Sequence, residues 1–539
     1  MLNRLFYPSF VAASLIFVLF PGCNNQKTAT SFITRDSIPK VTAKGSGIPG
    51  SFSTQTKIKF DSDLVKNFLD SFPKFKQFEN DISNFYKARD YAYAWYDDNG
   101  MIEPANNLYN RIQHLADEGI QDSLPYKTAF SNLMENEEGN DKTAPVLELM
   151  LTSQYLTYAK TAWEGISEKQ TVATEWLLPR KKITAQQLLD SLANGNNVLE
   201  NSPVYRQYNL LKAYLKKYTA LKKQNNFTDI QADKKSYRMG DSSSTISAIR
   251  ERLFSFGDLT TDNRSQIFDS TLHTGVKNFE HRFGYKEDGI INTALLAEMN
   301  YPLEKSIEQI IVNMERSRWI PVKPGTNYLV VNIPEFKLHV YENDSLAWSM
   351  NVVVGKNQHK TVVFNGDLKY IVFSPYWYIP ASILKKETLP AIKRNPNYLA
   401  THNMEWNGGA VRQKPGPNNS LGLVKFLFPN SHSIYLHDSP AKSLFNEDSR
   451  AFSHGCIRLA EPKKLAVYLL RDDAGWTEKS IGEAMAKGTE KYVTLKNTIP
   501  VFITYFTTWV DRRGNLNFRH DIYDRNTRLA KMIFEKPVI

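Results

Sequence analysis

The sequence predicts a multidomain α+β protein: a helical N-terminal scaffold, a small three-helix domain and a predominantly β C-terminal domain. Three observations predict this fold class. The chain has 539 residues, more than one hydrophobic core usually organises. Apolar residues recur at helical spacing through most of residues 61–300. From Tyr328 onward they alternate with polar residues, as in strands with one buried face.

The composition is that of a basic globular protein. Hydrophobic residues make up 42% of the chain and charged residues 23%, which argues against bulk disorder. The formal net charge of +11 favours an acidic partner: nucleic acid, a polyanionic cell-wall polymer or an anionic membrane surface. No block of Lys and Arg and no zinc-type spacing of Cys and His supports nucleic acid, so we expect no nucleic-acid partner.

The first residues have the pattern of a secretory signal, predicted over 1–23. Arg4 precedes a short apolar stretch, Leu5 to Phe20. Gly22-Cys23 resembles a bacterial lipoprotein cleavage site, so lipidation of Cys23 and membrane anchoring are expected. The alternatives are a plain signal peptide or an uncleaved anchor. Residues 24–60, rich in Thr, Ser, Lys and Gly, are predicted to be a flexible linker.

Residues 61–225 are predicted to form the helical scaffold domain. One helix is expected to bury a single face, made by Leu147, Met150, Leu151, Tyr155 and Tyr158. Earlier in the chain, the same spacing is found for Leu108, Ile112 and Leu115. The segment from Tyr91 to Gly100 is interpreted as a packed aromatic cluster that ends in a turn before a helix.

Residues 240–303 are predicted to be a compact unit of three helices. Two helical faces stand out: Ile246, Ile249, Leu253 and Phe256, then Leu272, Val276, Phe279 and Phe283. The unit resembles the three-helix peptidoglycan-binding domain; a generic helical spacer is the alternative. The resemblance is carried by Ile249, Arg250, Leu253, Gly257, Asp258, Leu259, Phe268, Asp269, Val276, Lys277, Phe279, Asp288, Gly289 and Ile290.

Residues 325–510 are predicted to form the β domain, followed by a C-terminal extension, 511–539. Phe336, Leu338 and Val340 alternate with polar residues. A helical piece is expected near 382–394, and a hairpin is expected to join 501–510 to 515–518 through Asp-Arg-Arg-Gly. Further strands are predicted at Met350–Gly355, Tyr370–Ser374, Val424–Phe428 and Ser433–Leu436.

Cys456 follows Ser453-His454-Gly455, and His437 lies 456 − 437 = 19 residues upstream. A free thiol has a pKa of about 8.5, so it needs a nearby base to react at neutral pH. Two imidazoles, His437 and His454, are candidates, and we expect His437 to be the base because it ends a strand-like run that would approach Cys456 if the two segments pair. A third group normally orients such a histidine, and Asp438 follows it directly. Gly455 permits close backbone approach and leaves main-chain N–H groups for a developing oxyanion. The pattern predicts cysteine acyl chemistry.

The pattern also resembles the signature of the L,D-transpeptidases with a YkuD-like catalytic domain: a histidine, a spacer of this length, then Ser/Thr-His-Gly-Cys. Further segments resemble the large periplasmic, YcbB-like subgroup. They are Ile457-Arg458, Tyr435-Leu-His-Asp438, the six residues from Arg412 to Pro417, the seven from Ser374 to Pro380, and Ala94-Trp-Tyr-Asp97 with Gly100.

The resemblance implies a periplasmic, membrane-anchored transferase that makes 3→3 peptidoglycan cross-links through a Cys456 thioester. The implied donor is a tetrapeptide stem cleaved before its terminal D-alanine, and the acceptor is the diamino acid of a second stem. Hydrolysis of the same bond by an L,D-carboxypeptidase, or a non-catalytic cell-wall-binding lipoprotein, is the alternative. No metal or cofactor is implied, and a carbapenem is expected to acylate Cys456.

The remaining site residues are assigned through the same resemblance. His437 serves as general base and acid and is oriented by Asp438, through either its carbonyl or its side chain. Ser453, His454 and Gly455 shape the oxyanion site. Residues 381–410 are expected to form a lid-like insertion over the site. The expected substrate-binding residues are Arg458, Arg412 and Lys414, which suit carboxylates, together with Trp377, Tyr378 and Tyr435.

Overall fold

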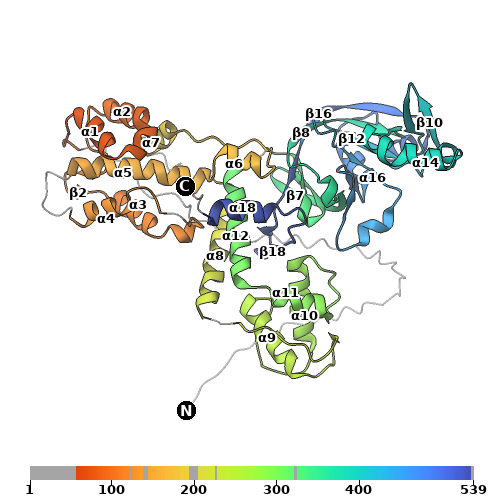
Figure 1. The fold of residues 1–539 in the computed structure, drawn as a ribbon, viewed down its shortest axis with the longest axis horizontal. Coiled ribbons are helices and arrows are strands. Elements are labelled where there is room, and N and C mark those ends of the chain that lie inside the picture. Colours follow the sequence, from red (N-terminus) through yellow and green to blue (C-terminus); the bar gives the residue numbers. More distant parts are fainter. Residues whose placement is uncertain are drawn as a thin grey trace, which may run out of the picture. The chain divides into compact units, whose positions relative to one another are not determined.

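The computed structural model describes residues 56–121, 123–136, 144–193, 204–224, 227–320 and 325–535. The predicted signal sequence with Cys23, and the predicted linker up to residue 55, lie outside these residues. Helices dominate up to residue 320 and strands dominate beyond it, which confirms the predicted α+β class (Figure 1). Within the described ranges, no helix has the length and apolar character needed to cross a bilayer.

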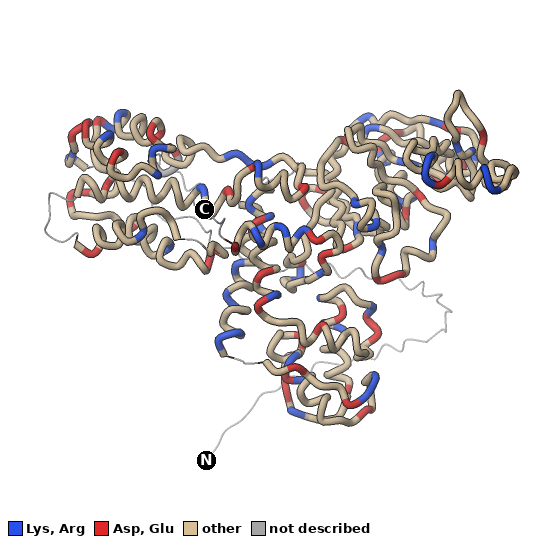
Figure 2. The backbone as a smooth tube through the Cα atoms, in the orientation of Figure 1, with Lys and Arg blue, Asp and Glu red and all other residues tan. Residues whose placement is uncertain are grey.

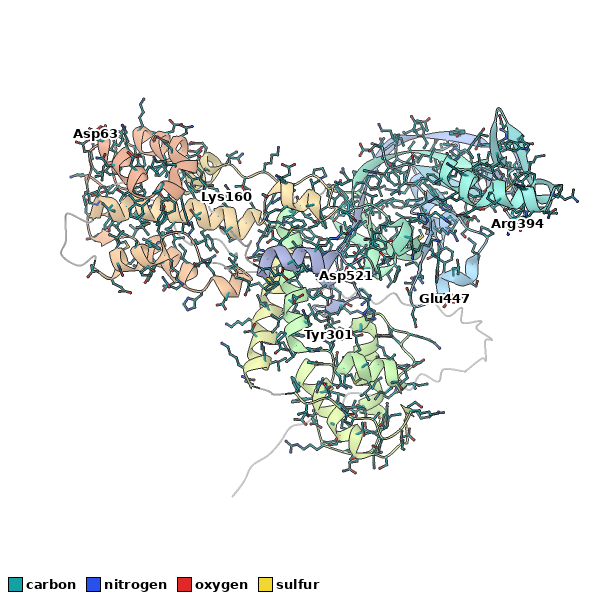
Figure 3. All side chains as sticks on the ribbon, viewed as in Figure 1. Asp63, Lys160, Tyr301, Arg394, Glu447 and Asp521 are labelled. Atoms are coloured by element: carbon teal, nitrogen blue, oxygen red, sulfur yellow. The ribbon has the colours of Figure 1, made fainter. Side chains whose placement is uncertain are left out.

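Among the N-terminal helices, α1, α3 and α4 pack against one long helix, α5, whereas α8 packs against α12 (Leu303–Trp319) (Figure 1). Asp63 and Lys160, labelled in Figure 3, mark the start of α1 and the residue after α5. The helices are α1 (Asp63–Ser71), α2 (Glu79–Ala88), α3 (Glu103–Gln113), α4 (Lys127–Glu135), α5 (Ala144–Ala159), α6 (Glu168–Ala173), α7 (Ala185–Ala193) and α8 (Gln207–Gln224).

Helix α5 corrects the prediction of a single buried face. Every residue from Leu147 to Ala159 is buried, including Glu148 and Thr152. A polar residue can be buried when its hydrogen bonds are satisfied. The Glu148 carboxylate accepts hydrogen bonds from the backbone N–H groups of Ala94 (2.6 Å) and Trp95 (3.1 Å), the latter in the predicted aromatic cluster. Periodicity alone could not reveal this pairing.

The three-helix unit contains α9 (Ser244–Phe256), α10 (Ser270–Phe283) and α11 (Thr293–Met299), around a core of their apolar residues. A two-stranded pair, β3 (Ser236–Tyr237) and β4 (Ile291–Asn292), ties its ends together. Asp258 and Arg282 form a buried ion pair in this unit. A following helix, α12 (Leu303–Trp319), contributes residues to both the scaffold core and the β-domain core.

The β domain is a sheet that closes on itself. In the described chain its order is β14-β7-β15-β13-β12-β8-β16-β5-β6, and β6 also pairs with β7. The strands are β5 (Tyr328–Asn332), β6 (Lys337–Glu342), β7 (Ser345–Gly355), β8 (Asn365–Phe373), β12 (Val424–Leu427), β13 (Leu436–His437), β14 (Ala451–Ser453), β15 (Ile457–Leu459) and β16 (Lys491–Thr504).

Three strand predictions need correction. Phe336 has a φ of 56° and ends a 3-10 turn, so β6 begins only after it. Ser433 has a φ of 55°, in the left-handed region, so the strand predicted from it begins later, as β13. The predicted hairpin starts at β17 (Thr508–Val510) and not at Val501, because β16 stays in the main sheet up to Thr504. Its partner is β18 (Leu516–Phe518).

Residues 381–410 form a mostly helical insertion that ends in a strand. It contains α13 (Ala381–Ile383), a π-turn (Leu384–Thr388), α14 (Leu389–Arg394, with Arg394 labelled in Figure 3), α15 (Tyr398–Thr401) and β10 (Met404–Asn407). β10 joins a separate sheet with β11 (Ala410–Gln413) and β9 (Trp377–Tyr378). Helices α16 (Pro462–Leu469), α17 (Glu478–Ala486) and α18 (Arg525–Phe534) complete the chain.

Charges of both signs are interspersed along the described chain (Figure 2). The segments that contain Tyr435, His437, Cys456 and Arg458 belong to the main sheet or directly adjoin its strands.

Candidate active site

Strands β13 and β15 run parallel and place four of the predicted residues on one face of the sheet. Leu436 pairs with Ile457, and His437 pairs with Arg458. Leu436, Ile457 and Leu459 are fully buried in the core, so the alternating residues must point to the opposite face. A backbone hydrogen bond from Ile457 to Tyr435 continues the ladder at 3.1 Å. Those alternating residues are Tyr435, His437, Cys456 and Arg458, with Cys456 diagonally across the ladder from His437.

Cys456 is partly buried at the start of β15. Its sulfur lies 3.6 Å from the carbonyl oxygen of Ser433, a weak thiol hydrogen bond. Burial raises the pKa of the thiol, because a thiolate is costly away from water. Hydrogen bonds from the backbone and side chain of Tyr435, and the charge of Arg458, oppose that rise. The resting sulfur is therefore a protonated thiol at neutral pH.

His437 is buried, with 4% of its surface exposed. Its Nδ1 lies 2.5 Å from the carbonyl oxygen of Asp438. A carbonyl only accepts, so Nδ1 carries the proton and Nε2 keeps a lone pair for a proton. Burial, and after it the charge of Arg458, lower the pKa of His437 to about 3, although hydrogen bonds to the carbonyls of Asp438 and Leu421 act in the opposite direction. The imidazole is neutral throughout the physiological pH range.

Asp438 contacts His437 through its backbone and not through its carboxylate. The carboxylate accepts hydrogen bonds from the backbone N–H groups of Leu423 (2.9 Å) and Ser439 (2.7 Å), and Lys442 Nζ lies 2.5 Å away. These bonds hold the turn that directs the Asp438 carbonyl at the imidazole. The carboxylate thus fixes the turn, and the carbonyl touches the ring.

The loop before Cys456 is closed by Ser453. The Ser453 hydroxyl donates to the carbonyl of Cys456 (2.5 Å) and accepts from the N–H of Gly455 (3.1 Å). Gly455 has a φ of 113°, which a residue with a Cβ rarely adopts. Of the two N–H groups expected at an oxyanion site, that of Gly455 is therefore occupied. Within the described ranges no acceptor is recorded for the N–H of Cys456.

His454 faces the 381–410 insertion. Its Nε2 lies 3.1 Å from Glu387 Oε1 in the π-turn, and its ring centroid is 4.9 Å from that of His359. Its side chain is partly exposed. The insertion therefore contacts the cysteine loop through this pair.

Arg458 is a half-buried cation beside Cys456. Burial lowers the pKa of the Arg458 guanidinium, and the interaction with the charge of Cys456 raises it in part. Its Nε is buried without a hydrogen-bond partner, and no carboxylate among the described residues forms an ion pair with it. A buried guanidinium without a counter-charge is unfavourable, so this site is suited to an anionic or carbonyl-rich ligand.

The other predicted binding residues form a separate group on the three-stranded sheet. Arg412 lies 2.6 Å and Lys414 3.1 Å from the carboxylate of Glu405. Arg412 also donates to the hydroxyl of Tyr378 (3.1 Å) and pairs with it across the sheet, beside Trp377. Among the described residues, no contact joins this group to Cys456. Both cations are already paired with Glu405.

Several contacting residues carry no sequence signal. Ser433 contributes a carbonyl to the sulfur, which any residue could supply. Thr361 contacts the cysteine loop from far along the chain, and Tyr523 contacts Thr361 in turn. Only their position in the fold identifies them. No group of three or more His, Cys, Asp or Glu side chains arranged to hold a metal ion is found in the portion of the chain described.

Three stretches of the chain match models of known protein families. Residues 326–501 match the L,D-transpeptidase catalytic domain of the YkuD family, residues 80–215 a scaffold domain and residues 242–299 a peptidoglycan binding domain. A Haemophilus influenzae protein, provisionally named an L,D-transpeptidase, is 34% identical over 248 residues, 42% of this chain and 50% of that protein. The chain therefore spans half the length of that curated relative.

Solved structures overlap the chain only weakly. An L,D-transpeptidase from Mycobacterium smegmatis is 13% identical, with a TM-score of 0.20 over 33% of this chain and 58% of its own. An L,D-transpeptidase from Stackebrandtia nassauensis is 13% identical, with a TM-score of 0.23 over 51% of this chain and 97% of its own. TM-scores this low carry no structural argument, so the family assignment rests on the sequence matches.

Proposed function

Because this chain contains an L,D-transpeptidase catalytic domain of the YkuD family, we propose that it forms 3→3 peptidoglycan cross-links by cysteine acyl transfer. The proposed donor is a tetrapeptide stem, cleaved between its third residue and its terminal D-alanine. The observation that carries the proposal is the sheet face on which Cys456, His437 and Arg458 lie together. The matched peptidoglycan binding domain supports the polymer as the substrate.

The proposed resting state is a neutral thiol beside a neutral imidazole. The pKa of the thiol is raised and that of His437 is lowered to about 3. With the thiol above its usual 8.5, the gap exceeds about five pKa units, so a full proton transfer costs on the order of 7 kcal/mol before the ions attract one another. The proton is therefore transferred as the sulfur bonds to carbon, and not in advance.

In the acylation step, Cys456 Sγ attacks the carbonyl carbon and its proton passes to His437 Nε2. The carbonyl oxygen becomes an oxyanion that accepts a hydrogen bond from the N–H of Cys456, for which no acceptor is found among the described residues. When the tetrahedral intermediate collapses, the C–N bond breaks and His437 returns the proton to the nitrogen of departing D-alanine. A thioester remains on Cys456.

In the second step, the side-chain amine of an acceptor stem attacks the thioester. His437 takes a proton from the attacking nitrogen, the C–S bond breaks, and the proton returns to Cys456 Sγ. Arg458, which has no counter-charge among the described residues, is proposed to bind a carboxylate of the stem. The 381–410 insertion is proposed to act as a lid, supported by the contact of Glu387 with His454.

The test is incubation of the whole protein with a purified disaccharide-tetrapeptide, followed by mass spectrometry. The expected product is a dimer lacking one D-alanine, absent with Cys456→Ala or His437→Ala and retained with His432→Ala, a histidine packed on Phe364. A shortened monomer would identify an L,D-carboxypeptidase instead. Activity that survives in Cys456→Ala would refute the covalent route, and inactive wild-type protein would leave only a wall-binding role.

A second measurement isolates acylation. A carbapenem is expected to add one mass equivalent to the wild-type protein, located on Cys456 by peptide mapping. The protein is proposed to act in the cell envelope, as its peptidoglycan binding domain requires. Anchoring through lipidated Cys23 remains a proposal, tested by detergent partitioning of wild type and Cys23→Ala after expression in a lipoprotein-processing host.

A further inference from the structure

A short turn after β7 supports the cysteine loop from behind. Thr361, at the end of this turn, donates its hydroxyl to the carbonyl oxygen of Gly455 at 2.9 Å. The same hydroxyl accepts from the N–H of Gly355 at 2.9 Å. One side chain therefore links the last residue of β7 to the residue before Cys456, and its hydrogen-bonding capacity is used in both directions.

The two backbones also pack directly on one another. A Cβ added to Gly355 would lie 2.0 Å from the carbonyl oxygen of His359 and 3.1 Å from the Cα of Gly455. Neither neighbour is a flexible side chain, so no methyl group fits between them. This close approach leaves the Gly455 peptide little room to rotate.

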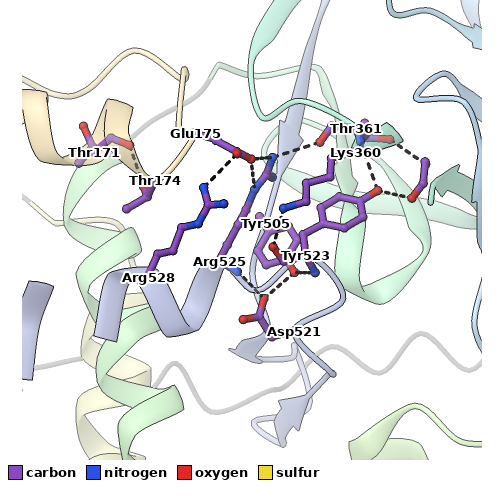
Figure 4. A network of polar contacts seen from close by, with 11 residues as sticks. Thr171, Thr174, Glu175, Lys360, Thr361, Tyr505, Asp521, Tyr523, Arg525 and Arg528 are labelled. Carbon is purple, nitrogen blue, oxygen red and sulfur yellow. Dashed lines mark hydrogen bonds and ion pairs between the residues drawn. The ribbon is translucent and has the colours of Figure 1, made fainter. Parts of the chain in front are cut away.

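Tyr523 holds this turn from the C-terminal segment (Figure 4). Its buried hydroxyl donates to the carbonyl of Gly355 and accepts from the N–H of Thr361 at 3.2 Å. Its own backbone is fixed by the Tyr505 hydroxyl at 2.9 Å and by Lys360 Nζ, also at 2.9 Å. Tyr523 lies beyond the matched catalytic domain, which ends at residue 501.

Arg525 extends the network to the helical N-terminal part. Its guanidinium reaches the carbonyl of Thr361 at 3.4 Å and the carboxylate of Glu175 at 3.0 Å (Figure 4). Its backbone N–H donates to Asp521 at 3.0 Å, which also accepts from Tyr505 at 2.6 Å. Three regions distant in sequence thus meet behind the cysteine loop.

The geometry of one peptide bond gives this network a chemical consequence. In a planar trans peptide, the carbonyl of Gly455 and the N–H of Cys456 point in opposite directions. Holding the carbonyl toward Thr361 therefore turns the Cys456 N–H away from Thr361. That N–H has no acceptor recorded among the described residues and is the proposed oxyanion donor.

We propose that Thr361 and Tyr523 are positioning residues, which aim the N–H of Cys456 at the oxyanion of the acyl-transfer step. The inference rests on the proposed function, because it assigns these residues to its oxyanion site. It also makes the C-terminal segment part of the active unit. Neither residue touches the substrate; both act through the Gly455–Cys456 peptide.

The experiment compares two reactions of the same sulfur. Carbapenem acylation passes through an oxyanion, whereas exchange with a small aromatic disulfide does not. Thr361→Val, which keeps the shape of the side chain but removes its hydroxyl, is expected to slow acylation about 10- to 100-fold. This is less than the roughly 100- to 1000-fold loss when an oxyanion donor is removed outright, because the Cys456 N–H is misdirected and not lost. Disulfide exchange is expected to change less than about 3-fold, and Thr361→Ser is expected to restore acylation to within about 3-fold.

The matched control is Thr508→Val. Thr508 is equally buried, but its hydroxyl has no hydrogen-bond partner among the described residues, so its variant is expected to acylate like wild type. If Thr361→Val does not fold, Tyr523→Phe replaces it, with an expected loss in acylation of about 3- to 10-fold. The inference is overturned if the folded Thr361 or Tyr523 variant is acylated as fast as wild type. It is also overturned if acylation and disulfide exchange slow by the same factor. A wild-type protein that is never acylated refutes the proposed function instead.

Discussion

The hydroxyl of Tyr435 forms a side-chain hydrogen bond with the sulfur of Cys456. The variant Tyr435→Phe removes this hydroxyl and keeps the rest of the side chain. The hydrogen bond stabilises the thiolate against the burial that raises the pKa of the thiol. A hydrogen bond to a charged group contributes about 1.5–3 kcal/mol. One pKa unit corresponds to about 1.36 kcal/mol, so the variant is expected to raise the pKa of Cys456 by about 1–2 units.

The expected rate follows from two opposing effects. Below the thiol pKa, each unit of increase lowers the thiolate fraction about tenfold. The remaining thiolate is more nucleophilic, by about threefold per unit for a Brønsted coefficient of 0.4–0.5. Disulfide exchange at neutral pH is therefore expected to slow by about 3- to 15-fold in Tyr435→Phe.

The assay is the rate of exchange with a small aromatic disulfide, followed by absorbance between pH 6 and pH 10. The control is Tyr378→Phe, since Tyr378 contacts Arg412 and no recorded contact among described residues joins it to the sulfur. An apparent pKa unchanged within about 0.3 units, or a faster reaction, would show that the Tyr435 hydroxyl does not stabilise the thiolate.

Three further predictions concern charges. Burial raises the pKa of Glu148 to about 7 in the folded chain, so the folded state keeps a proton that the unfolded state loses above about pH 4.5. The free energy of unfolding should therefore fall by on the order of 3 kcal/mol from pH 5 to pH 8. Urea unfolding at both pH values should show a smaller fall in Glu148→Gln. Equal slopes would contradict this. Asp258→Ala leaves the buried Arg282 unpaired and should cost about 3–5 kcal/mol; an unchanged thermal transition would count against it. Arg458→Lys keeps the charge but loses the planar guanidinium that binds a carboxylate through two hydrogen bonds. The KM for the donor stem should therefore rise about tenfold, while the rate of disulfide exchange stays within about threefold of wild type. An unchanged KM would show that Arg458 does not bind the substrate.

The shared face of the candidate site follows from the side-chain period of two in strands, but only once the parallel pairing of the two segments is known. Once the two segments pair, Tyr435 and His437 on one strand and Cys456 and Arg458 on the other must face the same side. The spacing of the motif does not by itself determine that pairing, which also depends on Leu436 and Ile457 filling the core.

Other features depend on contacts that sequence does not encode locally. The carbonyl of Asp438, and not its carboxylate, faces His437 because residues 421–424 fold against that carboxylate. The burial of α5 on all sides depends on partners for Glu148 that come from a different segment. The strand predicted at Ser433 begins later because that residue turns into the left-handed region. Each of these is a tertiary effect that overrides a local pattern.

The two perturbed pKa values determine which parts of the site matter most for the proposed reaction. A thiol with a raised pKa beside an imidazole with a pKa of about 3 holds almost no standing thiolate, so the basicity of His437 cannot be what activates the sulfur at rest. Such a thiol is also slow to oxidise, because oxidants attack the thiolate. The barrier must then be lowered where charge appears during attack, at the carbonyl oxygen. We therefore expect the hydrogen bonds that aim the Cys456 N–H, through Gly455 and Thr361, to affect the acylation rate more than any group that deprotonates the free enzyme.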